Sequence, residues 1–274
     1  MTALVPTKIA CLGAGQMAEA LLGGLLAAKV AEPADLWATD PSESRRDLLK
    51  QRFGIRVGSD NGEAALWADV VLLAVKPQVL ESVLHDVSSS LSGRLIISIA
   101  AGIRIRYVAD RLPAGARIVR VMPNAPAMVR EGMSVLAFGS TVTDTDKTAV
   151  QRMFESVGRV ALVDEALMDA VTGLSGSGPA YIFMAIEALA DGGVKMGLPR
   201  ATAELLAAQT AVGAARTVLE TGEHPGRLKD RVASPGGTTI AGLHQLEQGG
   251  FRAGLIAAVR AATERARELG QPDR

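Results

Sequence analysis

A glycine-rich stretch near the start of the chain carries the clearest chemical signal in the sequence. The segment IACLGAGQMAEALLGGLL places Gly13, Gly15 and Ala18 in a G-x-G-x-x-A arrangement between an apolar run and a helical pattern. The glycines allow a tight turn and a close approach to a pyrophosphate, and the helix start offers free amides to phosphate. An ordinary glycine-rich turn is the alternative. The residues predicted to contact a dinucleotide here are Gly13, Ala14, Gly15, Gln16 and Met17.

The next polar cluster leaves the choice of nucleotide open. Asp40 follows about 20 positions after the glycine motif, where an acidic residue binds the ribose 2′-hydroxyl of NAD. Ser42 and the neighbouring Arg45 and Arg46 could instead hold the 2′-phosphate of NADP, because arginine supplies paired donors. The arginines fit a solvated helix face equally well. Spacing alone does not separate NADP from NAD.

Three turns further along each follow an apolar run: AVKPQ (74–78), SIAAGI (98–103) and RVMPNAPAMV (120–129). In a parallel sheet the carboxyl ends of the strands line the ligand crevice, so we expect these turns to border the nicotinamide. Any one of them alone could be a simple turn. The residues predicted to contact the cofactor there are Ala74, Val75, Lys76, Pro77, Ala101, Gly102 and Asn124.

A second candidate site, SPGGTT (234–239), lies far from the glycine motif and precedes a helical pattern. It combines hydroxyl groups, glycine amides and a helix N-terminus. Such a nest suits a carboxylate, and a threonine hydroxyl can hydrogen-bond a ring nitrogen. A well-capped helix start with a flexible lead-in is the alternative. The helix after it is expected to turn Ile240, Leu243 and Leu246 inward.

No strong general acid accompanies these motifs. The turn SGSGPAYIFM (175–184) is followed by Ile182, Phe183 and Met184, where two-domain hydroxy-acid dehydrogenases carry a lysine. The three histidines, His85, His224 and His244, are scattered, without metal-ligand or triad spacing, and no metal site is expected. A substrate that arrives already protonated, such as a cyclic iminium ion, needs no such acid.

The elements that must position these residues change type near residue 165. Short apolar runs alternating with helical patterns predict strands at 9–12, 36–38, 70–75, 95–99, 118–121, 135–138 and 159–163. Several of these strands are apolar on both faces, which predicts a doubly wound parallel sheet covered by helices on each side, that is, an α/β Rossmann-like domain. After Glu165 strand patterns vanish. We therefore expect a dinucleotide-binding domain at 1–164 and an all-α domain at 165–274.

Composition narrows the partners. The chain has 274 residues, with 29 basic against 29 acidic side chains, which gives no general attraction to nucleic acid. A signal peptide and a membrane span are not expected, and the single Cys11, read as a buried strand residue, fits a reducing cytoplasm. The segment PAYIFMAIEALA (179–190) is apolar on nearly every face, which predicts burial against a second subunit. A central helix in a monomeric bundle is the alternative.

The chain resembles the pyrroline-5-carboxylate reductases along essentially its whole length. The resemblance rests on GAGQMAEAL (13–21), AVKP (74–77), SIAAG (98–102), MPNAPA (122–127), SGSGPAY (175–181), GGVKMGLPR (192–200) and HPGRLKDRVASPGGTTIAGLHQLE (224–247). It implies NAD(P)H-dependent reduction of 1-pyrroline-5-carboxylate to L-proline, the last step of proline biosynthesis. It also implies a helical domain that interlocks two subunits, in homodimers that can assemble into decamers.

The resemblance also assigns roles to residues. Ser234, Gly237 and Thr238 are expected to hold the substrate carboxylate, Thr239 to contact the ring nitrogen, and Asn61 to contact a cofactor ribose. Gly236 is counted with them among the substrate-binding residues. NADPH is the expected cofactor. Asp40 departs from the small neutral residue common at its position, which leaves NADH open.

The sequence is also compatible with two other functions. A related enzyme could reduce a six-membered piperideine carboxylate, and a noncatalytic NAD(P)-responsive scaffold could act through its dimer.

Overall fold

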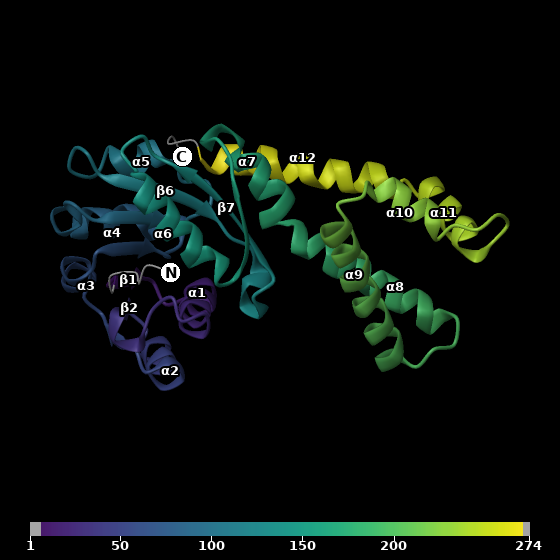
Figure 1. Ribbon diagram of the computed structural model, residues 1–274, viewed down its shortest axis with the longest axis horizontal. Helices are drawn as coiled ribbons and strands as arrows, with labels where there is room; N and C mark the ends of the chain where they lie inside the picture. The colour runs from purple at the N-terminus through teal and green to yellow at the C-terminus, as the bar shows by residue number, and fades with distance from the viewer. Residues whose placement is uncertain (1–6, 271–274) are drawn as a thin grey trace. The chain divides into compact units, whose positions relative to one another are not determined.

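The computed structural model describes residues 7–270, which form two compact units. One unit comprises the chain up to Ser177 together with the residues from Ala261 onward, and the other is Gly178–Arg260 (Figure 1). The predicted division into domains at 1–164 and 165–274 is close to this partition but differs from it, and it stays a prediction.

The first unit is built on one sheet of eight strands within the described residues, in the order β3-β2-β1-β4-β5-β6-β7-β8. The strands are β1 (Ile9–Leu12), β2 (Leu36–Thr39), β3 (Arg56–Gly58), β4 (Val70–Leu73), β5 (Leu95–Ser98), β6 (Arg117–Met122), β7 (Gly132–Phe138) and β8 (Gly158–Leu162). The order 3-2-1-4-5-6 of the first six strands is that of a dinucleotide-binding fold, and the predicted fold class is confirmed.

Helices follow most strands of this sheet. They are α1 (Gln16–Ala27), α2 (Glu43–Phe53), α3 (Asn61–Trp67), α4 (Pro77–Val87), α5 (Ile105–Ala109), α6 (Asp144–Glu155) and α7 (Met168–Val171). The later part of the chain contains α8 (Gly178–Lys195), α9 (Arg200–Thr221), α10 (Pro225–Arg231), α11 (Thr238–Gln248) and α12 (Phe251–Leu269). The described residues after Glu165 contain no strand, as the pattern predicts.

The sheet is buried on both faces, as a doubly wound fold requires. Along β1, Ile9 and Cys11 belong to one apolar cluster and Ala10 and Leu12 to another, because successive strand residues point to opposite faces. Leucines of α1 complete the first cluster and leucines of α4 complete the second. The glycine motif therefore follows a strand that the core holds from both sides.

Two strands differ from the sequence prediction. β3 is short and lies in a polar stretch, so it gave no apolar signal. β7 pairs antiparallel with β6 inside a sheet predicted to be parallel. The connection between them holds the short 3-10 helix η3 (Ala125–Val129) and is too brief for the crossover that a parallel neighbour needs.

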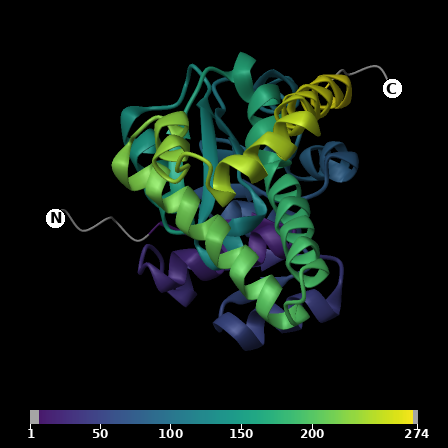
Figure 2. The same cartoon turned by 90° about the vertical axis from the view of Figure 1, so that its right-hand side faces the viewer.

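In the second unit, α8 and α9 form a helical hairpin, which Figures 1 and 2 show from two sides. The helices pack through the small side chains of Ala190, Ala203 and Ala207, with Ile186 and Val194 beside them. Small residues let the two backbones approach closely, but they cover little of the larger apolar side chains on the same helices. Much of the apolar surface of α8 therefore remains exposed in the single chain.

Candidate active site

The turn between β1 and α1 can be made only with a glycine at its first position. Gly13 has φ +101°, and a Cβ there would lie 2.8 Å from the carbonyl oxygen of Ala74. The Gly13 amide donates to the carbonyl of Thr39 at 2.9 Å. The carboxyl ends of β1, β2 and β4 therefore meet at this turn, where the strand order reverses. Open α/β sheets bind their ligands at that switch point.

The start of α1 fits a pyrophosphate. Gly15 is the N-cap residue, and no side chain caps the helix, so its first amides stay available. A Cβ on Gly15 would meet nothing within 4 Å, and both Gly15 and Gln16 are exposed. Met17 is half-buried, and Ala18 is buried against the sheet as the motif requires. The space beside Gly15 can therefore admit a phosphate at the positive end of the helix dipole.

At the end of β2, Asp40 is held by backbone amides. Its two carboxylate oxygens accept hydrogen bonds from the amides of Ala14 and Ser42, each at 2.9 Å. The Arg46 guanidinium donates to the carbonyls of Asp40, at 2.7 Å, and Pro41, at 3.0 Å. Arg45 donates to the carbonyl of Ala14 at 2.7 Å and pairs with Glu19 at 2.8 Å. Both arginines thus contact the protein and are not a purely solvated face.

Asn61 lies next to this cluster. It opens α3, which Asp60 caps by accepting from the amide of Glu63 at 2.9 Å. The Asn61 side-chain oxygen accepts from the Thr39 hydroxyl at 2.6 Å, which fixes the side chain beside the end of β2. The cofactor role of Asn61 stays a prediction.

The turns after β4 and β5 lie at the same edge of the sheet. Ala74 and Val75 are half-buried, Lys76 is the exposed N-cap of α4, and Pro77 occupies the first position of that helix. After β5, Ala101 is exposed and Gly102, at φ +76°, is buried beneath Leu269 and Gly270 at the end of α12. The structure thus brings the predicted cofactor residues of these turns to the switch-point edge.

Asn124 is fixed by the protein on both ends of its amide. Its oxygen accepts from the amide of Met133 at 2.8 Å, and its nitrogen donates to the carbonyl of Ser175 at 3.1 Å. Ser175 belongs to the π-helical segment Thr172–Gly176, a geometry frequent at functional sites. Asn124 therefore joins the turn after β6 to the segment that leads into α8, and its predicted contact with the cofactor is untested.

Sequence reasoning missed the buried ion cluster behind this turn. Arg120 of β6 is 4% exposed and pairs with Glu165 at 3.5 Å and Asp169 at 3.3 Å. Glu165 also accepts from the amide of Ile105 at 2.6 Å. The one available signal was a charged residue inside the apolar run RIVRVM, which requires charged partners that a linear pattern does not identify.

The predicted substrate turn precedes α11. Gly236 has φ +67°, and the Gly237 amide donates to the carbonyl of Ser234 at 3.0 Å. Gly237 is the N-cap residue, and no side chain caps the helix, so the hydroxyls of the first turn are not used as caps. Thr239 is half-buried, whereas Ser234 and Thr238 are exposed. Gly237 thus starts the helix without a side-chain cap, and the role of this turn in substrate binding stays a prediction.

The expectation that the α11 side chains face inward is wrong for two of them. Ile240 is 45% exposed and Leu246 is 47% exposed, while Leu243 is half-buried. These side chains are therefore left uncovered in the single chain. The substrate turn (234–239) and the edge of the sheet formed by the turns after β1, β2, β4 and β5, called the cofactor edge below, belong to different compact units. Their pairing in one active site remains a prediction.

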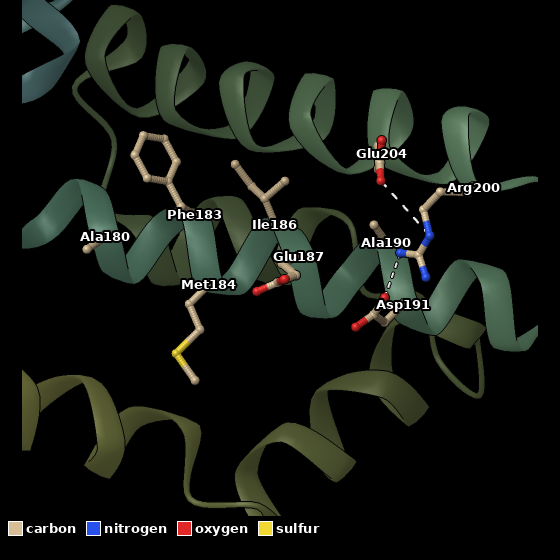
Figure 3. A pocket seen from close by; sticks show the side chains of 9 residues that line it. All are labelled: Ala180, Phe183, Met184, Ile186, Glu187, Ala190, Asp191, Arg200 and Glu204. Carbon is tan, nitrogen blue, oxygen red and sulfur yellow. Dashed lines mark hydrogen bonds and ion pairs between the residues drawn. The ribbon is translucent and has the colours of Figure 1, made fainter.

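Figure 3 shows a hollow on the surface of α8 and α9. Phe183 and Ile186 are directed toward α9, and Met184 points to the opposite side. Phe183 is 61% exposed and Met184 is 73% exposed. At one end of the hollow, Arg200 pairs with Asp191 at 2.6 Å and with Glu204 at 4.0 Å. An apolar surface with charged groups at its edge is typical of a protein interface.

Residues 7–270 contain no group of three or more potential metal-binding side chains. His224 caps α10 by accepting from the amide of Gly226 at 3.1 Å, and His85 and His244 are exposed. None of the helices described is long and apolar enough to cross a membrane.

Comparison with known proteins gives consistent matches. Residues 165–269 match a model described as pyrroline-5-carboxylate reductase dimerisation, and residues 8–102 match one described as NADP oxidoreductase, coenzyme F420-dependent. The chain is 48% identical to the pyrroline-5-carboxylate reductase of Synechocystis sp., covering 96% of this chain and 98% of that protein. It is 43% identical to the Escherichia coli enzyme, with the same coverage of both chains.

Solved structures agree. A pyrroline-5-carboxylate reductase from Coxiella burnetii superposes with a TM-score of 0.91 at 39% identity, covering 97% of this chain and 100% of that one. A pyrroline carboxylate reductase from Plasmodium falciparum, with NADP bound, gives 0.89 at 35% identity, covering 97% and 98%. On the near-complete coverage and the identity of these relatives, this chain belongs to the pyrroline-5-carboxylate reductase family of oxidoreductases.

Proposed function

We propose that this protein reduces 1-pyrroline-5-carboxylate to L-proline with NADPH or NADH. The observation that carries the proposal is the cofactor edge: a glycine turn with room beside Gly15, uncapped amides at the start of α1 and an oriented Asn61. The curated relatives that cover nearly the whole chain bear the name of this reductase, and one solved relative contains NADP.

The chemistry suits a site without a strong acid. A reduced nicotinamide held at the cofactor edge would supply the hydride and leave as the oxidised cofactor. The new C–H bond forms at the imine carbon, and the π-electron pair of the C=N bond moves to the nitrogen. When the imine enters as the iminium ion, the product is a neutral secondary amine and no proton has to come from the protein. The residues of this chain must therefore bind, orient and exclude water.

The turn before α11 supplies the groups for substrate binding. Ser234, Gly237 and Thr238 hold the substrate carboxylate at the N-terminus of α11, through the two hydroxyl groups and the positive end of the helix dipole, and Gly236 belongs to the same substrate-binding turn. Thr239, half-buried at the first turn of α11, contacts the ring nitrogen. Thr239 is thus the residue assigned to catalysis, as a group that fixes the orientation of the imine carbon.

The active form is a homodimer, and dimers can assemble into a decamer. The matched dimerisation model covers α8 and α9, whose apolar side chains remain exposed in the single chain. A second copy is a suitable cover for this surface. The cytoplasm is the proposed location, on the argument that the single Cys11 forms no intrachain disulfide.

A comparison of substrates tests the proposal against its alternatives. The purified protein is mixed with NADPH or NADH and either pyrroline-5-carboxylate or the six-membered piperideine carboxylate, and loss of reduced cofactor is followed. We expect a higher kcat/KM for the five-membered ring than for the six-membered ring. A preference for the six-membered ring would support the related reductase, and cofactor binding without turnover of either ring would support the scaffold.

A further inference from the structure

The turn after β5, residues 99–104, is held against the end of α12. Gly102 is buried in this turn. A Cβ added to Gly102 would lie 3.4 Å from the nitrogen of Gly270 and 3.5 Å from the carbonyl carbon and Cβ of Leu269. Gly102 also has φ +76°, in the left-handed region that favours glycine. The turn therefore meets the end of the helix through a residue without a side chain.

The other side of this contact needs a glycine for a different reason. Gly270 does not have a left-handed φ, so its backbone conformation could carry a side chain. A Cβ added to Gly270 would lie 2.7 Å from the carbonyl oxygen of Gly102, well inside van der Waals contact. Position 270 thus requires glycine because two backbones approach closely there. A larger residue must displace either the turn or the end of the helix.

The turn is the more easily displaced of the two partners. The amide of Gly270 donates to the carbonyls of Ala266 at 3.1 Å and Arg267 at 3.2 Å, and Ala266 is 4% exposed, so the end of the helix is anchored. Within the turn, the amide of Ile103 donates to the carbonyl of Ala100 at 3.4 Å, which is a long hydrogen bond. We therefore expect a side chain at position 270 to move the turn.

Movement of this turn matters because of Ala101. Ala101 is exposed between the buried Ala100 and Gly102, just beyond the carboxyl end of β5. Ligands of open α/β sheets bind outside the carboxyl ends of the strands. The pyrophosphate is expected at the turn after β1, so the turn after β5 is left to contact the nicotinamide half of a dinucleotide. The end of α12 thus holds the turn that is expected to border the reacting ring.

We propose that Gly270 is a positioning residue for hydride transfer: by leaving room for the Gly102 carbonyl, it lets α12 hold Ala101 against the nicotinamide half of the cofactor. The inference rests on the proposed function, because it needs a dinucleotide at the cofactor edge. It adds to that edge a helix that begins in the second compact unit, at Phe251, and ends in the first.

Binding of a cofactor and of its nicotinamide-free fragment tests this role. The reduced cofactor that the wild type binds more tightly, NADPH or NADH, is compared by calorimetry with 2′-phospho-ADP-ribose or ADP-ribose. In Gly270→Ala the dissociation constant of the cofactor should rise by about tenfold, the scale of one displaced contact, while that of the fragment stays within about twofold. At saturating cofactor kcat should fall by about ten- to a hundredfold, because misplacement by about 1 Å has an effect of that size.

Two variants of the same helix are the controls. Gly254→Ala adds the same methyl group where nothing lies within 4 Å, and Glu268→Ala removes the exposed ion pair with Arg265 next to the contact. Both should bind the cofactor and the fragment as the wild type does.

Three results would overturn the inference and leave the proposed function intact. Equal weakening of cofactor and fragment in Gly270→Ala would give the residue a structural role only. Unchanged binding and unchanged kcat in that variant would mean that the end of the helix yields instead of the turn. An equal effect in either control would remove the link to the Gly102 carbonyl. A wild-type protein that binds neither cofactor would overturn the proposed function together with the inference.

Discussion

Thr239 carries the proposed substrate contact on a single hydroxyl. Thr239→Val keeps the shape of the side chain and removes that group, so kcat/KM for pyrroline-5-carboxylate should fall by roughly ten- to a thousandfold, which corresponds to about 1.4–4 kcal/mol. Some activity should persist, because a protonated imine requires no acid from the protein. Steady-state kinetics and the dissociation constant of the cofactor, expected to stay near normal, are the measurements.

The control for this variant is Thr221→Val. Thr221 lies at the end of α9, where its hydroxyl donates to the carbonyl of Thr217 at 2.7 Å. Thr221→Val should lower the melting temperature slightly and leave kcat and KM unchanged. If Thr239 serves only to start α11, its variant will lose thermal stability and keep normal kinetics, and Thr239 then has no place in the site.

Cys11 is chemically silent in the folded protein. Burial raises the pKa of its thiol from 9.0 to about 12, and the charge of Asp40 adds to the shift. The thiolate is therefore scarce, and iodoacetamide should fail to label native protein at pH 8 but label it after unfolding in guanidinium. Labelling of the native protein at the rate of a free thiol would contradict this picture.

The same shift makes stability depend on alkaline pH. Between pH 9 and about 12 the unfolded chain releases the Cys11 proton while the folded chain retains it, so the free energy of unfolding falls as the pH rises. Below pH 9 the contribution is fully present. Cys11→Ala should lose this part of the alkaline slope in denaturant titrations.

At the scale of elements, the turn between β1 and α1 contains one glycine that the fold requires and another that we expect only cofactor binding to require. A Cβ atom added at Gly15 would meet nothing within 4 Å, whereas one added at Gly13, where φ is +101°, would lie 2.8 Å from the carbonyl oxygen of Ala74. Gly15→Val should therefore keep the melting temperature and lose cofactor binding, and Gly13→Ala should lower the melting temperature. Calorimetric binding of NADH or NADPH to a fully folded Gly15→Val protein would refute the pyrophosphate assignment.

The ion cluster under β6 connects the sheet to the segment that leads into α8. Arg120→Met leaves Glu165 and Asp169 without their buried cation, which should reduce the free energy of unfolding by about 3 kcal/mol. Arg106→Met is the matched control, since that arginine is 90% exposed in its pair with Asp110 and should contribute almost nothing. Urea titrations of both variants measure the free energy of unfolding. Equally small decreases in the two variants would contradict a stabilising role for the ion cluster.

How far the sequence predicts these elements depends on the range of the interactions. The strand before Gly13 and the helix after Gly15 are visible because apolar runs and a glycine turn are local patterns. The contact of Asn124 with Ser175 and the pairing of Arg120 with Asp169 join residues far apart in the chain, and nothing in the local pattern encodes them. The strand β7 was predicted at 135–138, but its antiparallel direction was missed, because strand direction depends on the connection to the preceding strand.

On the scale of the whole molecule, the apolar face of α8 is the feature that the single chain leaves unexplained. Met184 is 73% exposed, so Met184→Asp should leave the folded subunit intact and weaken the dimer. Sedimentation velocity should then show a lighter species than the wild type. Leu66→Asp, the same kind of change at a side chain 60% exposed on α3, should keep the wild-type assembly. A wild type that sediments as an active monomer would contradict the proposed dimer.

The central claim is that this chain transfers a hydride from a reduced nicotinamide to the imine carbon of pyrroline-5-carboxylate. The most direct test uses NADH or NADPH deuterated on both positions of nicotinamide carbon 4, with the proline product analysed by mass spectrometry. We predict L-proline carrying a single deuterium at ring carbon 5, formed in equal amount to the cofactor oxidised, and none with Gly15→Val. Oxidation of the cofactor without labelled proline, or proline without deuterium, would contradict the account.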